Sequence, residues 1–219
     1  MSTRKPSLWI IGGPNGAGKS TVARGLFEAL DLSPSASVLN PDAIDHALHQ
    51  VVPRIAPRLR PPAWMRRPLR PAYTVGLNLL AVVTVEAVVA AAIEQRTDVC
   101  AETVMSTPKY LPHVRRAKAN GVETGLIFVA LPTPEAHVDR VRARVRANGH
   151  DVPRDRILQR WERSHQQLTD FAREVDRLLV FANLVGDPVF VAEKRDGVVT
   201  LHDRQVLPRV TQALAPLAA

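Results

Sequence analysis

The chain has 219 residues, enough for one globular domain with its own core. Hydrophobic residues make up 46% and charged residues 23%, the usual balance of a soluble folded protein, which argues against a disordered chain. The single cysteine, Cys100, excludes an internal disulfide and a multi-cysteine metal site, and it favours a reducing, cytoplasmic location. The net charge of +8 favours acidic partners such as nucleotides, phosphorylated sugars, nucleic acid or anionic lipid.

Short apolar runs alternate with helical patterns in the first part of the chain. Residues 7–11 form an apolar run that ends in glycines, which is typical of a buried strand. A helix is expected over 19–30 and a second strand over 35–39. Asn40-Pro41-Asp42 ends that strand, and a short helix is expected to follow through residue 50.

Residues 51–72 differ from the rest of the chain because prolines and arginines are interspersed there. They are Pro53, Pro57, Pro61, Pro62, Pro68 and Pro71, with Arg54, Arg58, Arg60, Arg66, Arg67 and Arg70. Each proline removes a backbone donor and restricts the residue before it, so we expect an irregular basic excursion rather than a helix. A flexible, solvated loop is the simplest interpretation, and docking to a partner or a membrane surface is the alternative.

The segment 72–95 is expected to form one long apolar helix. Its most apolar part is long enough to suggest a membrane span. However, it contains Asn78, Thr84 and Glu86, and a charge near the centre of a bilayer is costly. A buried helix is therefore favoured, and no membrane span is expected.

The second half of the chain continues the alternation of strands and helices. Strands are expected over 98–102, 125–131, 179–181 and 189–191, and helices over 110–120, 134–147 and 153–179, with a terminal helix from residue 205. Asp196-Gly197 predicts a hairpin turn toward a last strand at 198–200. This alternation implies an α/β fold with a mostly parallel central sheet and helices on both faces.

A glycine-rich motif lies between the first expected strand and the first expected helix. It reads Gly13-Pro14-Asn15-Gly16-Ala17-Gly18-Lys19-Ser20-Thr21 and matches the P-loop pattern of Gly, four residues and Gly-Lys-Ser. The glycines let backbone N–H groups turn inward around phosphate oxygens, and the helix start adds positive potential. Lys19 can reach the β- and γ-phosphates, Ser20 can ligate Mg²⁺, and Thr21 serves the helix start or the α-phosphate. The motif predicts a P-loop NTPase fold that binds ATP with Mg²⁺.

Three more segments fall mostly at the carboxyl ends of expected strands, where a phosphoryl-transfer site would recruit residues. They are Asn40-Pro41-Asp42, 102–107 (Glu-Thr-Val-Met-Ser-Thr) and 140–153 (Arg-Val-Arg-Ala-Arg-Val-Arg-Ala-Asn-Gly-His-Asp-Val-Pro). Together with the P-loop, these segments and their spacing resemble the zeta toxin family of P-loop kinases, specifically its zeta-like "predicted ATPase" branch. The resemblance covers residues 7–195 except the excursion at 51–72, and it implies a kinase-like three-layer sandwich.

The resemblance also implies a small-molecule kinase that uses ATP and Mg²⁺. Zeta toxins phosphorylate UDP-N-acetylglucosamine on the 3′-hydroxyl of the sugar, so this compound is the first acceptor candidate. Asp42 matches the family's catalytic aspartate, which orients or deprotonates the acceptor hydroxyl. Glu102 and Thr103 match positions at the acceptor site. The alternatives are that Asp42 is a helix N-cap and that Glu102 pairs with a core arginine.

Arginines are concentrated in residues 140–165, which resemble the family's lid region. In the family, arginines of this region contact the phosphate in transfer, because a guanidinium suits its oxygens. Arg144 and Arg160 are the first choices for this catalytic role, followed by Arg163. Asn183 matches a family segment near the adenine.

The sequence leaves three functions open. The first is an ATP-dependent kinase that acts on a hydroxyl of a small metabolite. The net charge of +8 and the basic segment 51–72 motivate the second, a kinase acting on an RNA or DNA end. The third is a non-catalytic ATP-dependent binding switch or a toxin–antitoxin component with an antitoxin protein as partner. In each case residues 1–219 are expected to form a single P-loop kinase domain, with residues 203–219 as a C-terminal tail.

Overall fold

The computed structural model describes residues 5–29, 38–55, 66–147, 149, 151–185 and 187–218. These residues form a seven-stranded sheet in the order β2-β3-β1-β4-β5-β6-β7. The strands are β1 (Ser7–Gly12), β2 (Val38–Leu39), β3 (Val99–Glu102), β4 (Glu123–Ala130), β5 (Arg177–Ala182), β6 (Val189–Arg195) and β7 (Val198–Leu201). β2, β3, β1, β4 and β5 pair in parallel, whereas β6 and β7 are antiparallel. The expected α/β fold with a mostly parallel sheet is confirmed.

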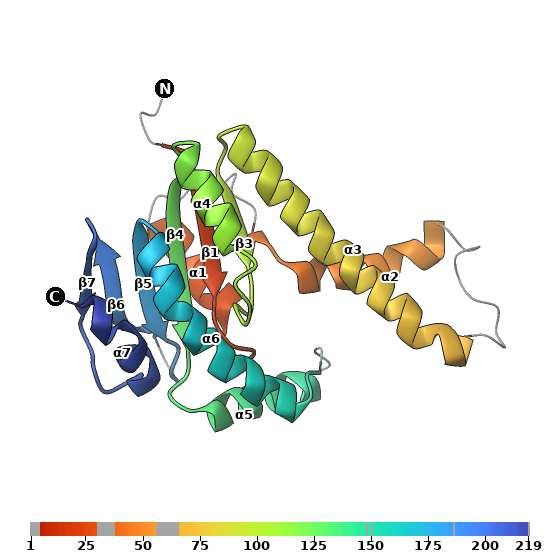
Figure 1. Cartoon of the computed structure of the whole chain (residues 1–219). Helices are drawn as coiled ribbons and strands as arrows, with labels where there is room; N and C mark the ends of the chain where they lie inside the picture. The colour runs from red at the N-terminus through yellow and green to blue at the C-terminus, as the bar shows by residue number, and fades with distance from the viewer. Residues whose placement is uncertain are drawn as a thin grey trace.

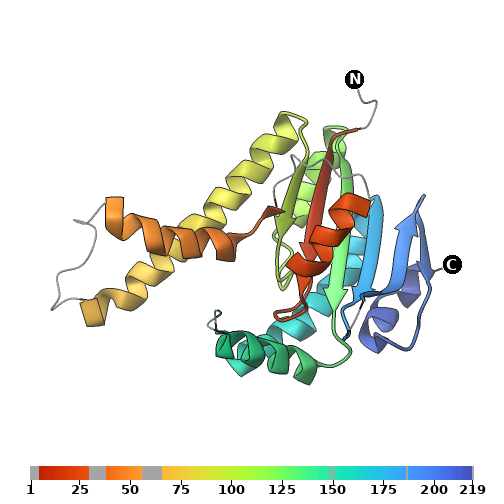
Figure 2. The same cartoon turned by 180° about the vertical axis from the view of Figure 1, so that it is seen from behind.

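Helices cover both faces of this sheet. They are α1 (Lys19–Ala29), α2 (Pro41–Ile55), α3 (Arg66–Glu94), α4 (Leu111–Ala119), α5 (Pro134–Arg146), α6 (Arg154–Glu174) and α7 (Pro208–Leu214), with a short 3-10 helix η2 (Ala215–Leu217). Figure 1 shows α4 and α6 in front of the strands, and Figure 2 shows α1 on the opposite face. In both views α2 and α3 cross each other and extend away from the sheet at its β2–β3 edge.

The side chains of β1 show how one strand serves two layers. Successive side chains of a strand point to opposite faces of the sheet. Leu8 and Ile10 belong to the apolar cluster that includes residues of α3, α4, α6 and α7. Trp9 and Ile11 belong to a second cluster that contains Val22 and other residues of α1. Because both faces are covered, the four residues 8–11 of β1 are all apolar instead of alternating between apolar and polar residues.

The apolar helix α3 is buried along one side only. The buried stripe, at four-residue spacing, consists of Leu77, Ala81, Val85, Val89 and Ile93. The exposed large hydrophobics of α3 are Val75, Leu79, Leu80, Val83 and Val88. Within the described residues, Val75–Glu94 is the one stretch long and apolar enough to cross a membrane, with mean hydropathy 2.1 and 28% of it buried. Length and composition are weak support for a span, because core helices of soluble proteins meet the same criterion. The expected burial is correct for one side of α3.

Two sequence predictions about helices are wrong. Where it is described, the segment 51–72 is helical, because α2 continues to Ile55 and α3 begins at Arg66. Pro68 lies in the first turn of α3, where a backbone N–H has no intrahelical partner, so this proline does not break the helix. Residues 56–65 lie outside the described residues. α6 ends at Glu174 rather than near 179, because the following residues pair with β4 as strand β5.

The turns that end several elements agree with the sequence prediction. Asp196 and Gly197 both have positive φ, 51° and 82°, and they join the antiparallel strands β6 and β7 as a tight hairpin. Gly121 follows α4 with φ of 71°, the left-handed conformation that commonly ends a helix. The expected terminal helix is present as α7.

Candidate active site

The P-loop runs from the end of β1 into α1, at the carboxyl edge of the parallel strands. Its glycines are needed for close packing as well as for backbone conformation. Gly13 has φ of 142°, and a Cβ there would lie 2.0 Å from the backbone oxygen of Val129 in β4. Gly18 has φ of 80°, and a Cβ there would lie 2.0 Å from Nδ2 of Asn183. Neither position has room for a side chain.

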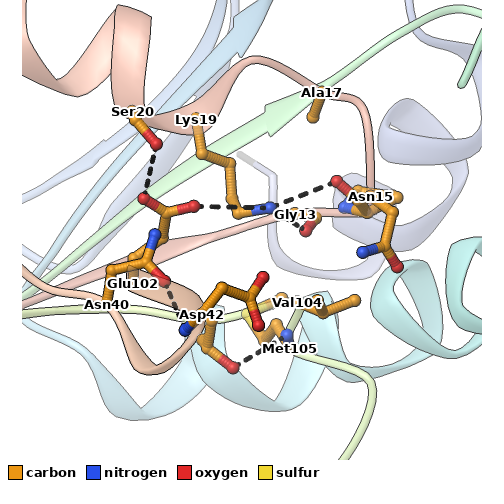
Figure 3. A network of polar contacts seen from close by, with 12 residues as sticks. Gly13, Asn15, Ala17, Lys19, Ser20, Asn40, Asp42, Glu102, Val104 and Met105 are labelled. Atoms are coloured by element: carbon orange, nitrogen blue, oxygen red, sulfur yellow. Dashed lines mark hydrogen bonds and ion pairs between the residues drawn. The ribbon is translucent and has the colours of Figure 1, made fainter. Parts of the chain in front are cut away.

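Lys19 is buried at the start of α1 and folds back over the loop (Figure 3). Its Nζ donates to the backbone oxygens of Gly13 at 3.0 Å and Pro14 at 3.2 Å. The same nitrogen lies 3.9 Å from Oε1 of Glu102. These oxygens compensate the ammonium group for lost water.

Charged groups of both signs surround Lys19. Burial lowers the pKa of Lys19 below its ordinary value. The carboxylates of Glu102 and Asp42 act against this shift, and the guanidinium groups of Arg144 and Arg160 add to it. Residues from α1, α2, β3, α5 and α6 therefore share one electrostatic site.

Glu102, the last residue of β3, contacts the start of α1. The Ser20 hydroxyl donates to Oε2 of Glu102 at 2.7 Å, as Figure 3 shows. β3 pairs directly with β1, so its carboxyl end lies beside the P-loop. The alternative in which Glu102 pairs with a core arginine is not what the structure shows. Its partners are Ser20 and Lys19.

Asp42 lies in the first turn of α2, but it does not cap the helix. Asn40 is the cap, because its Oδ1 accepts from the backbone N–H of Asp42 at 2.8 Å and lies 3.4 Å from that of Ala43. Pro41 occupies the first helical position, which suits a residue without an N–H. The Asp42 carboxylate is therefore not used for capping and faces the cavity described next.

A cavity of about 400 Å³ lies between the P-loop, α2, α3 and the segment after β3. It is lined by Asn15, Gly16, Lys19, Ser20, Asn40, Pro41, Asp42, Asn78, Val82, Glu102, Thr103, Val104, Ser106, Thr107, Lys109, Arg144 and Arg160. The residues expected to hold phosphates and those expected at the acceptor site thus face the same space. The expected P-loop residues Gly13, Pro14, Ala17, Gly18 and Thr21 are not among its lining residues.

The arginines after β4 differ in where they lie. Arg144 of α5 and Arg160 of α6 both line the cavity. Nη1 of Arg160 lies 3.3 Å from Oδ1 of Asn15, so α6 contacts the P-loop directly. Arg163 is exposed and is not among the lining residues. Arg142 is exposed beside Asp139, 3.5 Å away.

Sequence reasoning missed several residues of the site. Asn78 and Val82 of α3 line the cavity, as does Lys109, whereas the lining residues Ser106 and Thr107 belong to the segment 102–107 that the sequence had singled out. The signal for Asn78 was present as a polar residue inside an apolar helix. Nothing in the sequence placed α3 beside the P-loop, because that contact depends on how the helix crosses the sheet edge.

Two side chains from other elements hold the outer side of the P-loop. His137 of α5 is fully buried, and its Nδ1 lies 2.8 Å from the backbone oxygen of Asn15. Asn183, after β5, donates from Nδ2 to the backbone oxygen of Ala17 at 2.8 Å. Arg140 donates to the backbone oxygen of Asn183 at 2.8 Å. The loop is thereby fixed on the side away from the cavity.

The comparisons with known proteins identify the family and the fold. A family model described as an AAA domain matches residues 8–169. The match spans more than half of the chain, so the protein belongs to this AAA domain family. No curated protein matches the sequence.

Solved structures with the same fold include subunits of larger complexes. A chain of the PezAT chromosomal toxin–antitoxin system of the human pathogen Streptococcus pneumoniae has 16% identity and a TM-score of 0.62, over 99% of this chain and 89% of that one. A chain of the AvrRxo1-ORF1:-ORF2 complex with ATP has 16% identity and a TM-score of 0.64, over 95% of this chain and 64% of that one. A chain of the Pnkp1/Rnl/Hen1 RNA repair complex has 20% identity and a TM-score of 0.51, over 76% and 46%. At these identities the likeness concerns the fold, and it confirms the expected zeta-toxin-like, kinase-like P-loop fold.

Proposed function

We propose that this protein is an ATP- and Mg²⁺-dependent kinase that transfers the γ-phosphoryl group to a hydroxyl of a small metabolite. The shared cavity carries the proposal, because Lys19 and Ser20 line it together with Asp42. A carboxylate that can accept a proton therefore faces the same space as the groups that hold phosphates. In this proposal residues 1–219 work as one P-loop kinase domain.

The protein offers oxygen ligands that suit Mg²⁺. Ser20 presents a hydroxyl at the start of α1, with the Glu102 carboxylate 2.7 Å away. The described residues contain no group of three or more His, Cys, Asp or Glu that could hold a metal ion. This fits Mg²⁺, which usually takes few protein ligands in kinase sites and keeps phosphate oxygens and waters. When bound, the ion would neutralise phosphate charge; Ser20 would ligate it, and Glu102 would orient Ser20.

The proposed transfer uses three kinds of side chain. The acceptor oxygen bonds to the γ-phosphorus while the bond from that phosphorus to the ADP oxygen breaks, and Asp42 takes the hydroxyl proton. Lys19 holds the β- and γ-phosphates. Arg144 and Arg160 stabilise the charge that spreads over the transferring oxygens, and residues 140–165 act as a lid.

Polar side chains line the acceptor half of the cavity. Thr103, Ser106, Thr107 and Asn78 offer hydroxyl and amide groups for a hydroxyl-rich acceptor. UDP-N-acetylglucosamine is the first candidate, because the fold is zeta-toxin-like. The use of ATP and the single free cysteine, Cys100, support the cytoplasm as the location of the proposed reaction.

Two other functions have specific support. The PezAT neighbour belongs to a toxin–antitoxin system, which makes an antitoxin protein a candidate partner of this chain. The RNA repair neighbour and the net charge of +8 favour a kinase that acts on a nucleic-acid end. The modest cavity of about 400 Å³ favours a small acceptor over a nucleic-acid end, and a small acceptor is compatible with an antitoxin partner.

An acceptor screen tests the proposal. Purified protein is incubated with ATP and Mg²⁺, and ADP release is measured with UDP-N-acetylglucosamine, other nucleotide sugars, free polyols and 5′-hydroxyl oligonucleotides. The proposal predicts ADP formation that depends on one small acceptor. ADP release with oligonucleotides alone would favour the nucleic-acid alternative. Absence of ADP above the buffer level across the panel would contradict both kinase functions.

A further inference from the structure

The outer side of the P-loop has its own hydrogen-bond requirement. When loop N–H groups turn inward to form a phosphate-binding nest, neighbouring carbonyls point outward and need donors. In this protein the outward oxygen of Asn15 lies against His137, and that of Ala17 lies against Asn183. Gly16 packs on the same side, where an added Cβ would lie 2.7 Å from the backbone oxygen of His137.

The partners of His137 determine which ring nitrogen carries the proton. The backbone N–H of Leu131 donates to Nε2 at 3.0 Å, so Nε2 must be unprotonated. Nδ1 then carries the hydrogen and donates to the backbone oxygen of Asn15 at 2.8 Å. His137 is 0% exposed, so water cannot replace either bond. One neutral tautomer satisfies both partners.

We propose that His137 is a positioning residue for nucleotide binding. By fixing the Asn15 carbonyl outward, it holds the P-loop in the conformation whose N–H groups face the phosphates. The inference rests on the proposed function only through nucleotide binding, and it does not depend on which acceptor is used.

Asn15 also connects this contact to the cavity. Its side-chain oxygen faces Arg160, which we assign to the transferring phosphate, while its backbone oxygen faces His137. A substitution of His137 is therefore expected to affect both the phosphate-binding loop and Arg160, because Asn15 contacts both.

Burial supports the neutral form of the ring. It lowers the pKa of His137 to about 4, and the nearby charges of His165 and Lys19 act in the same direction. The hydrogen bond that the ring donates to Asn15 opposes that shift, whereas the bond accepted from Leu131 exists only with the neutral ring. The ring therefore keeps the required donor and acceptor near neutral pH.

Two amide substitutions separate the two bonds of His137. In His137→Asn the amide lies near the position of Nδ1 and can still donate to Asn15, but the acceptor for Leu131 is lost. In His137→Gln the amide reaches the position of Nε2 and can still accept from Leu131, but the donor to Asn15 is lost. Each variant loses one buried hydrogen bond, so their thermal midpoints should fall by similar amounts. His165→Gln is the matched control, because it removes another buried histidine that contacts Trp161 rather than the P-loop.

Two quantities are measured for each variant. They are the dissociation constants for ATP and ADP, by calorimetry, and the midpoint of thermal unfolding. We expect His137→Gln to weaken nucleotide binding about 10-fold, since one buried carbonyl loses its donor. His137→Asn and His165→Gln should stay within about 3-fold of the original protein. Equal weakening by the Asn and Gln variants, or no weakening by the Gln variant, would overturn the inference.

A measurement on the unsubstituted protein covers the case in which a variant does not fold. Nitrogen-15 NMR of the imidazoles should place the His137 proton on Nδ1 with and without nucleotide, whereas a proton on Nε2 overturns the inference. If the affinities follow the expected pattern but no acceptor is phosphorylated, the proposed function fails while the role of His137 stands.

Discussion

Oε2 of Glu102 accepts a hydrogen bond of 2.7 Å from the hydroxyl of Ser20, joining the end of β3 to the first turn of α1. The family resemblance alone placed Glu102 at the acceptor site. Its contact with Ser20 places it between the residues proposed to hold the phosphates and those proposed to bind the acceptor. It therefore lies next to the hydroxyl that we propose as a Mg²⁺ ligand. The following predictions test this arrangement.

Replacement of Glu102 by Gln should change the requirement for Mg²⁺. The amide keeps the size of the side chain but removes the charge that orients Ser20, and loss of such a supporting group typically costs ~10–100-fold in metal affinity or activity. We expect the Mg²⁺ concentration for half-maximal ADP formation to rise about 10-fold. Glu174→Gln is the control, because Glu174 pairs with Arg115 far from the cavity. An unchanged Mg²⁺ requirement would contradict the role of Glu102 in orienting Ser20 as a Mg²⁺ ligand.

Substitutions of Asp42 and Asn40 should have different effects, because we assign Asp42 to catalysis and Asn40 to the cap of α2. Asp42→Asn is expected to lower turnover about 100-fold or more while ATP affinity is kept, because the general base is lost. Asn40→Ala is expected to lower the free energy of unfolding by about 1 kcal/mol, because the cap of α2 is lost. If Asp42 is the general base, Asp42→Asn loses turnover while its free energy of unfolding, measured by urea unfolding, stays unchanged. Because Asn caps a helix as well as Asp does, capping is tested with Asp42→Ala, and a stability loss in that variant as large as in Asn40→Ala would restore the cap interpretation.

The lid arginines should act on the chemical step. Arg144→Ala and Arg160→Ala are each expected to reduce turnover by about 100-fold, the typical effect of removing one group that stabilises transition-state charge. Arg142→Ala is the matched control on the exposed side of α5, and its turnover should stay within about 2-fold because exposed ion pairs contribute little. Single-turnover kinetics with saturating ATP provide the measurement. A loss in Arg142→Ala comparable to that in Arg144→Ala would indicate general disruption of α5.

The pH dependence of stability should carry a contribution from His137. Burial lowers its pKa from 6.5 to about 4 in the folded protein. Between these values the unfolded chain binds a proton that the folded chain does not, so this stability is present above pH 6.5 and is lost as pH falls. Its contribution to the free energy of unfolding should fall by about 2 kcal/mol between pH 7 and pH 5. Urea unfolding should show that the original protein loses about 2 kcal/mol more than His137→Gln over this range. Parallel losses in the two proteins would contradict the assignment.

Paired substitutions in α3 test which side of the helix is buried. Val85 is 0% exposed and Val83 is 52% exposed, so they face different surroundings within one turn. Val85→Ala is expected to cost about 2 kcal/mol through a core cavity, while Val83→Ala should stay within about 0.5 kcal/mol. Equal costs would show that the exposed side of α3 is covered in solution.

The central elements were predictable because local sequence determines them. The apolar run of β1 and the P-loop pattern specify a strand, a phosphate-binding turn and a helix without reference to the rest of the chain. The Asp196-Gly197 hairpin is equally local. In contrast, residues 51–55 of α2 and 66–71 of α3 were mistaken for part of an irregular segment because of their prolines, although Pro68 lies in a first helical turn, where a proline costs little.

Part of the site could not be predicted for a different reason. His137 lies 122 positions from Asn15 in the sequence, and its contact with the P-loop exists only after β4 pairs with β1. Asn78 reaches the cavity through the crossing of α3 at the sheet edge. Such residues have no sequence pattern of their own, whereas Lys19 and Ser20 belong to a motif whose chemistry is fixed by residue type.

The most direct test of the proposed kinase is mass spectrometry of the acceptor after reaction with ATP labelled by oxygen-18 in the γ-phosphoryl group. UDP-N-acetylglucosamine and the other small acceptors are incubated with the protein or with Asp42→Asn. We predict that one hydroxyl acceptor gains a labelled phosphoryl group with the original protein and that the variant, which still binds ATP, yields almost none. Labelled inorganic phosphate without any phosphorylated acceptor, or equal transfer by both proteins, would contradict the proposal.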